Sequence, residues 1–393
     1  MESSPHIIIV GGGFGGVYTA KYLLSYGYIV TLINERNYFT FTPMLHEVAT
    51  GGLHAQDIIF EFQSFFKDDN FNFVRGHVSH VDLEKKTVYI GTQAIAGDYI
   101  VFATGAVTHT HGIQGSEAAY ELKTIDDAKE IKQKIIELIQ GPEQSAAITI
   151  IGAGPTGIEL AFEVEQFTSE LQALSGGKDT SYTIRLLNHS DHILRNFPKK
   201  IQNYTHQLLQ KSSIKFLENT TVDAIHDTEV VTSRGTFPST ITIMTSGVRP
   251  NTECLDKDML SQRDHVAVRK TLQLEQHDRI FALGDIIMIN GDAMPKLAQA
   301  ATDQASIVAQ NIKALIQNKS SLQEYFPNLR GLLISLGCHQ GAGSIHGIIL
   351  KGWFAWWLWR TVYLFKIPGV QNKIRIAFTW TLGLFTKRSL VEE

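Results

Sequence analysis

The sequence has very little cysteine: Cys254 and Cys338 are its two cysteines among 393 residues. Two cysteines are too few for a disulfide framework, and they do not form a C-x-x-C pair. Such a pair is the redox centre of dithiol reductases, so the sequence argues against those enzymes. The chain also lacks a signal-peptide pattern, because an expected strand already begins at His6. We therefore expect it to fold in a reducing compartment.

Charge is sparse and unevenly distributed. Charged residues make up 19% of the sequence and the net charge is −4, which gives no indication of nucleic-acid binding. Acidic residues are absent from residues 325–391, whereas basic residues are frequent there: Arg330, Lys351, Arg360, Lys366, Lys373, Arg375, Lys387 and Arg388. The same stretch holds all five tryptophans, which are Trp353, Trp356, Trp357, Trp359 and Trp380.

Two apolar runs in this stretch, residues 352–366 and 373–385, flank a Pro368-Gly369 turn. Neither run approaches the roughly 20 apolar residues that a membrane-spanning helix needs, and Pro368 prevents one continuous helix. Short tryptophan-rich helices with basic margins are typical of proteins that lie on a membrane surface. We therefore expect a membrane-associating helical segment. The alternative is a helical pair packed on the protein's own core or at a dimer interface.

Two glycine-rich turns, about 140 residues apart, each follow a short apolar strand and precede a helix. The first is Gly11-Gly12-Gly13-Phe14-Gly15-Gly16, and the second is Gly152-Ala153-Gly154-Pro155-Thr156-Gly157. In such turns the glycines allow a tight bend, close approach of a pyrophosphate and close packing of helix on strand. The helix N-terminus then offers N–H groups to the phosphates. The pair predicts an α/β fold with two Rossmann-like domains, each binding one dinucleotide.

The two turns differ in the strand that follows each of them. Residues 29–35 end in Glu35, a carboxylate about 20 residues after the glycines, where a ribose hydroxyl is bound. The matching strand, residues 182–187, is followed by Asn188-His189 and carries no carboxylate. We expect the second site to grip its ribose less tightly and to tolerate a 2′-phosphate.

Three further segments resemble parts of flavoproteins with two dinucleotide-binding domains. Residues 280–285 end in Gly284-Asp285, and the resemblance implies that Asp285 binds the ribityl chain of FAD. Residues 100–106, with Thr104-Gly105, resemble the strand and turn that close the FAD domain. Residues 245–248, with Gly247, are their counterpart in the second domain. The resemblance implies FAD on the first turn and a nicotinamide nucleotide on the second.

Taken in order, the motifs resemble those of type II NADH:quinone oxidoreductases, single-subunit enzymes that do not pump protons. The resemblance covers nearly the whole chain and is most specific in residues 11–16, 41–49, 152–161, 298–301 and 352–388. It implies that residues 41–45 run close to the flavin and the quinone. It also implies catalytic positions for Gln299, at the quinone end of the flavin ring, and for Glu159, near the contact between flavin and nicotinamide.

The remaining cofactor contacts are predicted on the same basis. Besides the first turn and Glu35, those to FAD are Arg36, Pro43, Val78, Thr104, Gly105, Asp285, Leu297 and Ala298. Those to the nicotinamide nucleotide are Gly152, Gly154, Pro155, Thr156, Gly157, Asn188 and Gly247. No metal is implied, and His109-Thr110-His111 is interpreted as part of a loop because no second set of ligands accompanies it.

Structural alternatives stand beside these assignments. Gln299 could simply decorate the helix that starts near Pro295, and Glu159 could be a carboxylate favoured by the dipole in the first turn of its helix. The chain also departs from the family: Asp303 stands where a second glutamine is frequent, residues 328–331 replace a Tyr-x-Asp-Lys-Gly-like stretch, and the ribose acid of the second domain is missing. These departures bear on quinone preference and NADH selectivity rather than on the general chemistry.

We expect an FAD-binding domain (residues 1–110 and 250–325), a nicotinamide-nucleotide domain inserted in it (111–249), and a C-terminal hairpin with anchoring helices (326–393). The predicted activity is hydride transfer from NADH, with NADPH as the alternative, to FAD, followed by two-electron reduction of a membrane quinone. The predicted location is the cytoplasmic face of a bacterial inner membrane, as a peripheral protein, with a homodimer as one option.

Three other functions compete with this prediction. A sulfide:quinone reductase has the same two folds but normally needs two or three redox cysteines near the flavin. A membrane-tethered nucleotide sensor would retain the folds without turnover. A reductase of a small iron–sulfur protein is the third, although the relatives with that activity lack a tryptophan-rich tail.

Overall fold

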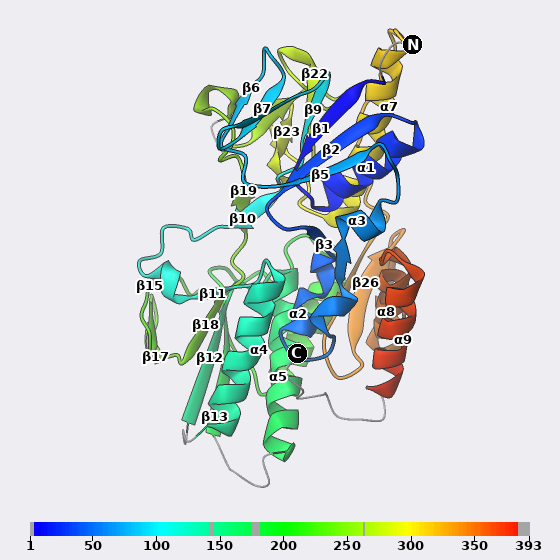
Figure 1. The fold of residues 1–393 in the computed structure, drawn as a ribbon. Helices are drawn as coiled ribbons and strands as arrows, with labels where there is room; N and C mark the ends of the chain where they lie inside the picture. Colours follow the sequence, from blue (N-terminus) through cyan, green and yellow to red (C-terminus); the bar gives the residue numbers. More distant parts are fainter. Residues whose placement is uncertain (1–3, 142–144, 175–180, 262–263, 384–393) are drawn as a thin grey trace. The chain divides into compact units, whose positions relative to one another are not determined.

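The computed structural model describes residues 4–141, 145–174, 181–261 and 264–383 (Figure 1). The chain divides into two compact units. Unit 1 consists of Met1–Thr40, Ile59–Val107 and Val248–Leu329, and unit 2 consists of Phe41–Ile58, Thr108–Gly247 and Arg330–Glu393. Unit 2 therefore includes residues 41–58 and the C-terminal segment besides the central domain expected from the sequence. The binding of one nucleotide by each predicted domain stays a prediction.

The core of unit 1 is a nine-stranded sheet with the strand order β24-β23-β20-β21-β22-β9-β1-β2-β5. Its strands are β1 His6–Val10, β2 Ile29–Asn34, β5 Phe71–Arg75, β9 Tyr99–Phe102, β20 Val266–Val268, β21 Gln273–Leu274, β22 His277–Ala282, β23 Ile287–Ile289 and β24 Asp292–Ala293. β1 pairs in parallel with β2 and β9, and β9 pairs in parallel with β22. Because parallel strands end at the same edge of a sheet, the segments that follow β1, β9 and β22 lie together.

The helices of unit 1 follow from this arrangement. α1 (Phe14–Ser25) starts directly after the first glycine-rich turn and packs on α7 (Ala298–Ile316). Two small antiparallel sheets and a short helix complete the unit. The sheets are β3 Tyr38–Thr40 with β4 Ile59–Glu61, and β6 His80–Asp82 with β7 Thr87–Ile90 and β8 Gln93–Ala96; the helix is α3 Phe62–Phe65. Ile7, Ile8 and Ile9 of β1 are fully buried, as expected for a central parallel strand.

Unit 2 is built on a five-stranded parallel sheet with the order β11-β18-β12-β13-β14. Its strands are β11 Tyr120–Glu121, β12 Ser145–Ile151, β13 Ser181–Leu187, β14 Lys215–Leu217 and β18 Ile241–Met244. The helices of this part are α4 Ile125–Gln140, α5 Pro155–Leu174 and α6 Lys199–Lys211, and β15 Val222–Ile225, β16 Glu229–Thr232 and β17 Gly235–Pro238 form a small antiparallel sheet. Strands β10 Ala106–Thr108 and β19 Val248–Pro250 pair where the chain passes from one unit to the other.

The C-terminal segment forms an antiparallel sheet and two helices within unit 2. These elements are β25 Gly331–Ser335, β26 Gly341–Ile345, β27 Ile348–Lys351, α8 Gly352–Lys366 and α9 Val370–Leu382. Gly369 has a φ of +74°, so the predicted Pro368-Gly369 turn does separate the two helices. Residues 41–58 add the 3₁₀ helices η1 Thr42–Met44 and η2 Ala55–Asp57 and the short helix α2 Leu45–Val48. None of the helices described here is long and apolar enough to cross a membrane.

Candidate functional site

The first glycine-rich turn, between β1 and α1, is crowded at its first and last glycines and open at Gly13. Gly11 has a φ of +106°, and a Cβ atom there would overlap the carbonyl oxygen of Ala103. A Cβ at Gly16 would overlap the carbonyl oxygen of Gly11. In contrast, a Cβ at Gly13 would meet nothing within 4 Å. Gly13 is also the N-cap of α1, which carries no side-chain cap and no acidic residue in its first turn. An open face beside unsatisfied helical N–H groups fits the pyrophosphate of a dinucleotide.

The second turn, between β12 and α5, repeats this arrangement. Gly152 has a φ of +109°, and its Cβ would lie 2.7 Å from Cα of Ser246. A Cβ at Gly157 would overlap the carbonyl oxygen of Gly152, whereas a Cβ at Gly154 would meet nothing within 4 Å. α5 begins at Pro155 and has no acidic residue in its first turn. This turn therefore fits a second pyrophosphate for the same reasons.

Each turn is braced by an asparagine at the end of the second strand: Asn34 is the last residue of β2, and Asn188 directly follows β13. The Gly12 N–H donates to Oδ1 of Asn34 (2.8 Å), and the Asn34 amide donates to the carbonyl of Arg36 (2.8 Å). The Ala153 N–H donates to Oδ1 of Asn188 (3.2 Å), whose amide donates to the carbonyl of Ser190 (2.9 Å). The two asparagines occupy equivalent positions, and sequence analysis did not identify this bracing role.

This equivalence identifies the residue of the second domain that corresponds to Glu35. Since Asn34 matches Asn188, Glu35 matches His189, the second residue of the Asn188-His189 pair that follows β13. Glu35 is exposed and lies 2.7 Å from Nδ1 of His77, next to the buried Val78. His189 is also exposed. The ribose contact assigned to Asn188 stays a prediction, but its amide is buried and already occupied within the turn.

The other predicted FAD contacts of unit 1 gather at the ends of neighbouring strands. Ala103 N–H donates to the carbonyl of Val10, and Leu283 N–H donates to that of Phe102, so the ends of β9 and β22 lie beside the first turn. Gly105, with a φ of +70°, and Asp285, in the 3₁₀ helix η5 (Gly284–Ile286), follow those two strand ends. Thr104 Oγ1 donates to the carbonyl of Asn251, and Leu297 is the N-cap of α7, which begins at Ala298.

Two residues expected near the quinone are also located. Gln299 is the second residue of α7, and its amide donates to the carbonyl of Asn328 (3.1 Å) within unit 1. Pro43 lies in η1 of unit 2. The roles of both in quinone reduction stay predictions.

Glu159 lies in a buried cluster of unit 2. It is the fifth residue of α5, so the expectation that it occupies the first turn is wrong, and a first-turn dipole cannot explain it. Its side chain is 12% exposed, accepts a hydrogen bond from Ser335 N–H (3.2 Å), and lies 3.9 Å from Nδ1 of His46. Burial raises the pKa of the Glu159 carboxyl well above its ordinary value, and the nearby carboxylates of Glu163 and Glu47 act in the same direction.

Aromatic side chains of the tail, which consists of α8 and α9, enclose this cluster. Trp359 is fully buried, with its ring centroid 5.9 Å from that of His46. Trp380 donates its indole N–H to Oε2 of Glu47 (2.8 Å). Burial, and after it the charge of Glu159, raises the pKa of the Tyr363 hydroxyl. Sequence analysis missed the roles of Glu47 and Glu163. The one available signal was the i, i+4 spacing of Glu159 and Glu163 on a largely apolar helix.

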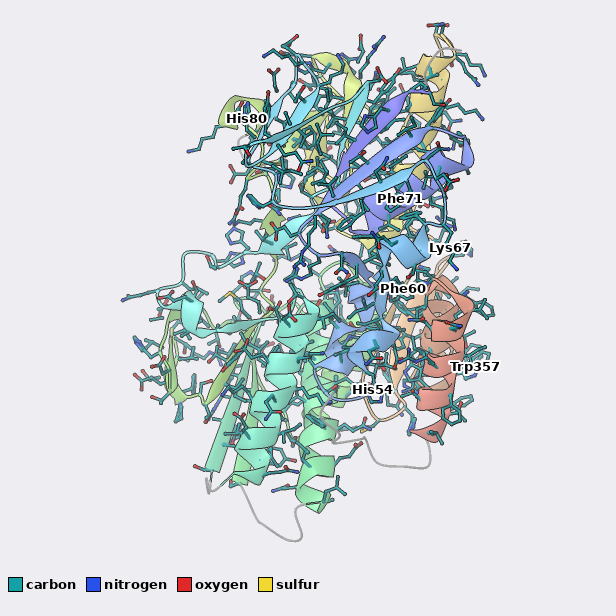
Figure 2. All side chains as sticks on the ribbon, in the orientation of Figure 1. His54, Phe60, Lys67, Phe71, His80 and Trp357 are labelled. Atoms are coloured by element: carbon teal, nitrogen blue, oxygen red, sulfur yellow. The ribbon has the colours of Figure 1, made fainter. Side chains whose placement is uncertain are left out.

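The tail has one buried face and one exposed face. Trp356, Trp359 and Trp380 are buried, and Arg360 stacks over the rings of Trp356 (4.2 Å) and Trp380 (4.8 Å). The opposite face exposes Trp353, Phe354, Trp357, Phe365, Val370, Ile374, Phe378 and Leu382. Figure 2 shows Trp357 on the outer side of α8. The sequence left two interpretations of these helices open. Packing on the protein's own core describes the buried face, and the exposed face remains available for a membrane or a dimer interface.

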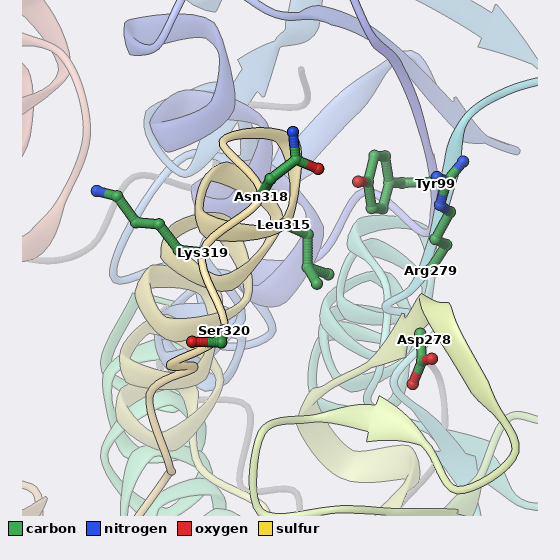
Figure 3. Close-up of a pocket in the computed structure, with 7 residues that line it drawn as sticks. All are labelled: Tyr99, Asp278, Arg279, Leu315, Asn318, Lys319 and Ser320. Atoms are coloured by element: carbon green, nitrogen blue, oxygen red, sulfur yellow. The ribbon is translucent and has the colours of Figure 1, made fainter.

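Other features of the described residues do not join the site. A pocket of about 330 Å³ in unit 1 lies at the amino end of β9 and contains no predicted site residue (Figure 3). Ligands of open parallel sheets bind at the carboxyl ends of the strands instead. Cys254 and Cys338 lie in different units and form no disulfide, and burial raises the pKa of Cys254 to about 11. Among the residues that the structure describes, no group of three His, Cys, Asp or Glu side chains could hold a metal ion.

Comparison with known proteins gives consistent results. The chain is 26% identical over 387 residues to a protein of Staphylococcus aureus (strain NCTC 8325 / PS 47) named type II NADH:quinone oxidoreductase, covering 93% of this chain and 96% of the relative. The fold matches NDH2 of Plasmodium falciparum in complex with NADH, with a TM-score of 0.91 and 20% identity over 99% of this chain and 100% of that one. It also matches the sulfide:quinone oxidoreductase of Aquifex aeolicus, with a TM-score of 0.77 and 21% identity over 98% and 96% of the two chains.

These matches confirm the predicted α/β fold class and the resemblance to type II NADH:quinone oxidoreductases. The family model described as pyridine nucleotide-disulphide oxidoreductase matches residues 5–305, which include both glycine-rich turns and the segment with Asp285. The chain therefore belongs to the pyridine nucleotide-disulphide oxidoreductase family.

Proposed function

We propose that the protein is an FAD-dependent NADH:quinone oxidoreductase that binds FAD at Gly11–Gly16 and NADH at Gly152–Gly157. The observation that carries this proposal is the repeated turn, in which Gly13 and Gly154 leave an open face beside a helix N-terminus. Membership of the family and the names of the relatives support the same reaction. Bound FAD supplies the chemistry that links a hydride donor to a two-electron acceptor.

The buried cluster of unit 2 supports a role for Glu159 in proton supply. Reduction of a quinone by two electrons consumes two protons, so a proton must be held in a site from which bulk water is excluded. A carboxyl with a raised pKa holds its proton to a higher pH than an ordinary glutamate does. Nδ1 of His46, 3.9 Å away, is the neighbouring group that could exchange a proton with it. We assign Glu159 as the residue that holds this proton.

Gln299 is assigned to the acceptor side of the reaction. Replacing it with alanine removes an amide that positions the acceptor, and should leave reduction of the flavin by NADH nearly unchanged. Reoxidation of the reduced flavin by a soluble quinone should slow by roughly tenfold, the effect of losing one well-placed hydrogen bond of about 1.4 kcal/mol. Anaerobic rapid mixing, followed at the flavin absorbance band, separates the two half-reactions.

The same experiment tests the proposed function with the unmodified protein. Absence of flavin reduction by NADH would refute the NADH assignment, and absence of reoxidation by quinone would refute the quinone assignment. An unchanged quinone half-reaction in Gln299→Ala would remove only Gln299 from the site. Reduction of the flavin by sulfide instead of NADH would favour the sulfide:quinone alternative, whose structural relative has the lower TM-score.

We further propose that the exposed face of α8 and α9 lies on a membrane surface, from which a lipid-dissolved quinone is taken. Eight large apolar side chains on this face, together with the absence of acidic residues from 325–391, support contact with anionic lipid. The proposed location is the cytoplasmic face of a bacterial inner membrane.

Replacing Trp353 and Trp357 with serine should therefore weaken binding to vesicles that contain phosphatidylglycerol by roughly tenfold or more. The reason is that burial of the apolar surface of each indole contributes more than about 1 kcal/mol to the binding free energy. Vesicle sedimentation measures the change. The matched control replaces the exposed Leu174 of α5 with serine and should have no effect. Equal vesicle binding by all three proteins would refute the membrane assignment.

A further inference from the structure

Two histidines of unit 2, interpreted from the sequence only as loop residues, lie beside the second glycine-rich turn. His109 and His111 stack with ring centroids 4.0 Å apart and an angle of 20° between the ring planes. Ser246 connects them to the turn. Its hydroxyl donates to the carbonyl of His109 (3.2 Å), and its Cα would lie 2.7 Å from a Cβ at Gly152.

The place of the two histidines relative to the sheet of unit 2 indicates which half of a bound dinucleotide they face. In the order β11-β18-β12-β13-β14, the chain continues from β12 through β13 to β14, whereas β18 lies on the other side of β12. The direction of the connections thus reverses between β12 and β18, and ligands bind outside the carboxyl ends of the strands at such a reversal. One half of a dinucleotide then extends over β13 and the other over the end of β18. Thr245, Ser246 and Gly247 follow β18, so the histidines border the second half.

Hydrogen bonds fix the proton positions on both neutral rings. The His111 N–H donates to Nδ1 of His109 (2.8 Å), so this nitrogen carries a lone pair and the His109 proton is on Nε2. The carbonyl of Ser246 can only accept, so Nε2 of His111 donates to it (3.1 Å). The remaining ring nitrogen of His111, Nδ1, is consequently a hydrogen-bond acceptor.

Two further observations fit a ligand-binding role for this space. His111 has a φ of +54°, a left-handed conformation that costs free energy in a residue with a side chain and is often found at functional sites. Gly247, with a φ of +125°, has open space above it, since a Cβ there would meet only Nε2 of His111, at 4.0 Å. The strained backbone therefore holds the His111 ring beside an open glycine at the end of β18.

From this geometry we infer that His111 binds the nicotinamide half of NADH, with its Nδ1 accepting a hydrogen bond from a ribose hydroxyl or from the carboxamide. His109 is a positioning residue: it holds the His111 ring by stacking on it and by accepting a hydrogen bond from the backbone N–H of His111. This inference rests on the proposed NADH-binding function and extends it to the nicotinamide end.

The test compares His111→Ala, His111→Asn, His109→Ala and a control, His226→Ala, in the FAD-loaded protein at one fixed pH. His226 is an exposed histidine of the same unit. Calorimetric titration with NAD⁺ gives the Kd, and anaerobic rapid mixing with NADH gives both the apparent Kd and the limiting rate of flavin reduction.

His111→Ala should raise the Kd roughly three- to tenfold, the value of one net hydrogen bond. The effect should fall on the Kd more than on the limiting rate. His111→Asn should recover part of the loss, because the asparagine side-chain oxygen is also an acceptor. His109→Ala should shift the Kd in the same direction by a smaller factor, and His226→Ala should match the unmodified protein.

A second measurement does not depend on turnover. In protein with ¹⁵N-labelled histidine, the His111 ring signals should shift on addition of NAD⁺, while those of His226 should not. Wild-type affinity in both His111 variants, or His111 signals that do not respond to NAD⁺, would overturn the inference while leaving the proposed function intact. Failure of NADH to reduce the flavin of the unmodified protein would overturn both.

Discussion

The two glycine-rich turns share one backbone design but differ in the residues around it. In each, the first glycine has a φ near +107°, the middle one faces open space and the last allows the helix to pack on the strand. Each turn is also fixed by an asparagine side chain. The differences lie at two equivalent positions: Glu35 in unit 1 corresponds to His189 in unit 2, and Tyr18 on α1 corresponds to Glu159 on α5.

This comparison shows which requirements are general and which are specific. The shared features are those expected of a pyrophosphate site, which needs free N–H groups and open space. The features that differ can serve only one of the two ligands. A carboxylate at Glu35 suits ribose hydroxyls, whereas a buried, protonatable group follows only the second turn, where hydride and proton chemistry are proposed.

The strongest test of the shared design places a valine at each middle glycine. Gly13 has φ −81° and ψ −166°, which valine adopts readily, and no atom lies within 4 Å of the added Cβ. Gly13→Val should therefore fold but exclude the pyrophosphate, giving colourless protein. Gly154→Val should retain the yellow colour of bound FAD but lose reduction by NADH by a factor of a hundred or more, because a steric block in the pocket costs more than about 3 kcal/mol.

Absorbance at the flavin band and anaerobic addition of NADH measure both outcomes, and circular dichroism verifies the fold. A yellow, fully loaded Gly13→Val protein would contradict the assignment of the first turn. Loss of FAD from Gly154→Val would contradict the division of labour between the turns.

Much of this design could be predicted from the sequence, and the limits have physical causes. The glycines and their spacing predicted both turns, because backbone constraints leave few other residues possible there. The bracing role of Asn34 and Asn188 was not predicted, since it depends on side-chain direction at the strand end. Which residue of Asn188-His189 corresponds to Glu35 was not predicted, because the spacing from glycine to acid is only approximate. Glu47 joins the Glu159 cluster through tertiary contacts, which no local pattern encodes.

The second test concerns Tyr18 and Glu159. The pKa of Glu159 is raised in the folded protein, chiefly by burial, whereas an unfolded glutamate has a pKa of about 4.3. The folded state therefore binds the proton more tightly, so this contribution to stability is complete below the unfolded pKa and is lost as the pH rises through the folded pKa. Relative to Glu159→Gln, which cannot ionise, the wild-type protein should lose thermal stability as the pH rises from 5 to 9.

Calorimetry across this pH range, at constant ionic strength, measures the difference in Tm. Tyr18→Phe is the matched control on α1. Burial raises the pKa of Tyr18 above 10, so this hydroxyl does not ionise in the range, and the Tm difference between the control and wild type should not depend on pH. Parallel Tm curves for wild type and Glu159→Gln would mean that the carboxyl is ionised in the folded and the unfolded protein alike across this range, which would contradict its role as a proton-holding group.

The smallest expected effect concerns Glu35 and His189, the pair that decides the ribose contact. If His189 occupies the position of the ribose-binding acid, then His189→Glu adds a negative charge near the 2′ position and should disfavour NADPH. An exposed pair of charges about 4 Å apart in water interacts by about 1 kcal/mol, so the ratio of kcat/KM for NADPH to that for NADH should fall roughly fivefold. Steady-state kinetics with both nucleotides at low ionic strength measures this ratio, and added salt should reduce the effect.

Two comparison variants locate the contact. His192→Glu adds the same charge three residues further on, at an exposed histidine that lies 3.1 Å from Asp191, and should change the ratio less. Asn188→Glu tests the position assigned from the sequence. It also removes the amide that donates to the carbonyls of Ser190 and His192, so it should destabilise the turn and weaken both nucleotides together. A selective loss of NADPH in Asn188→Glu, with no change in His189→Glu, would restore the assignment to Asn188 and show that the acid of the first turn is not equivalent to His189 in function.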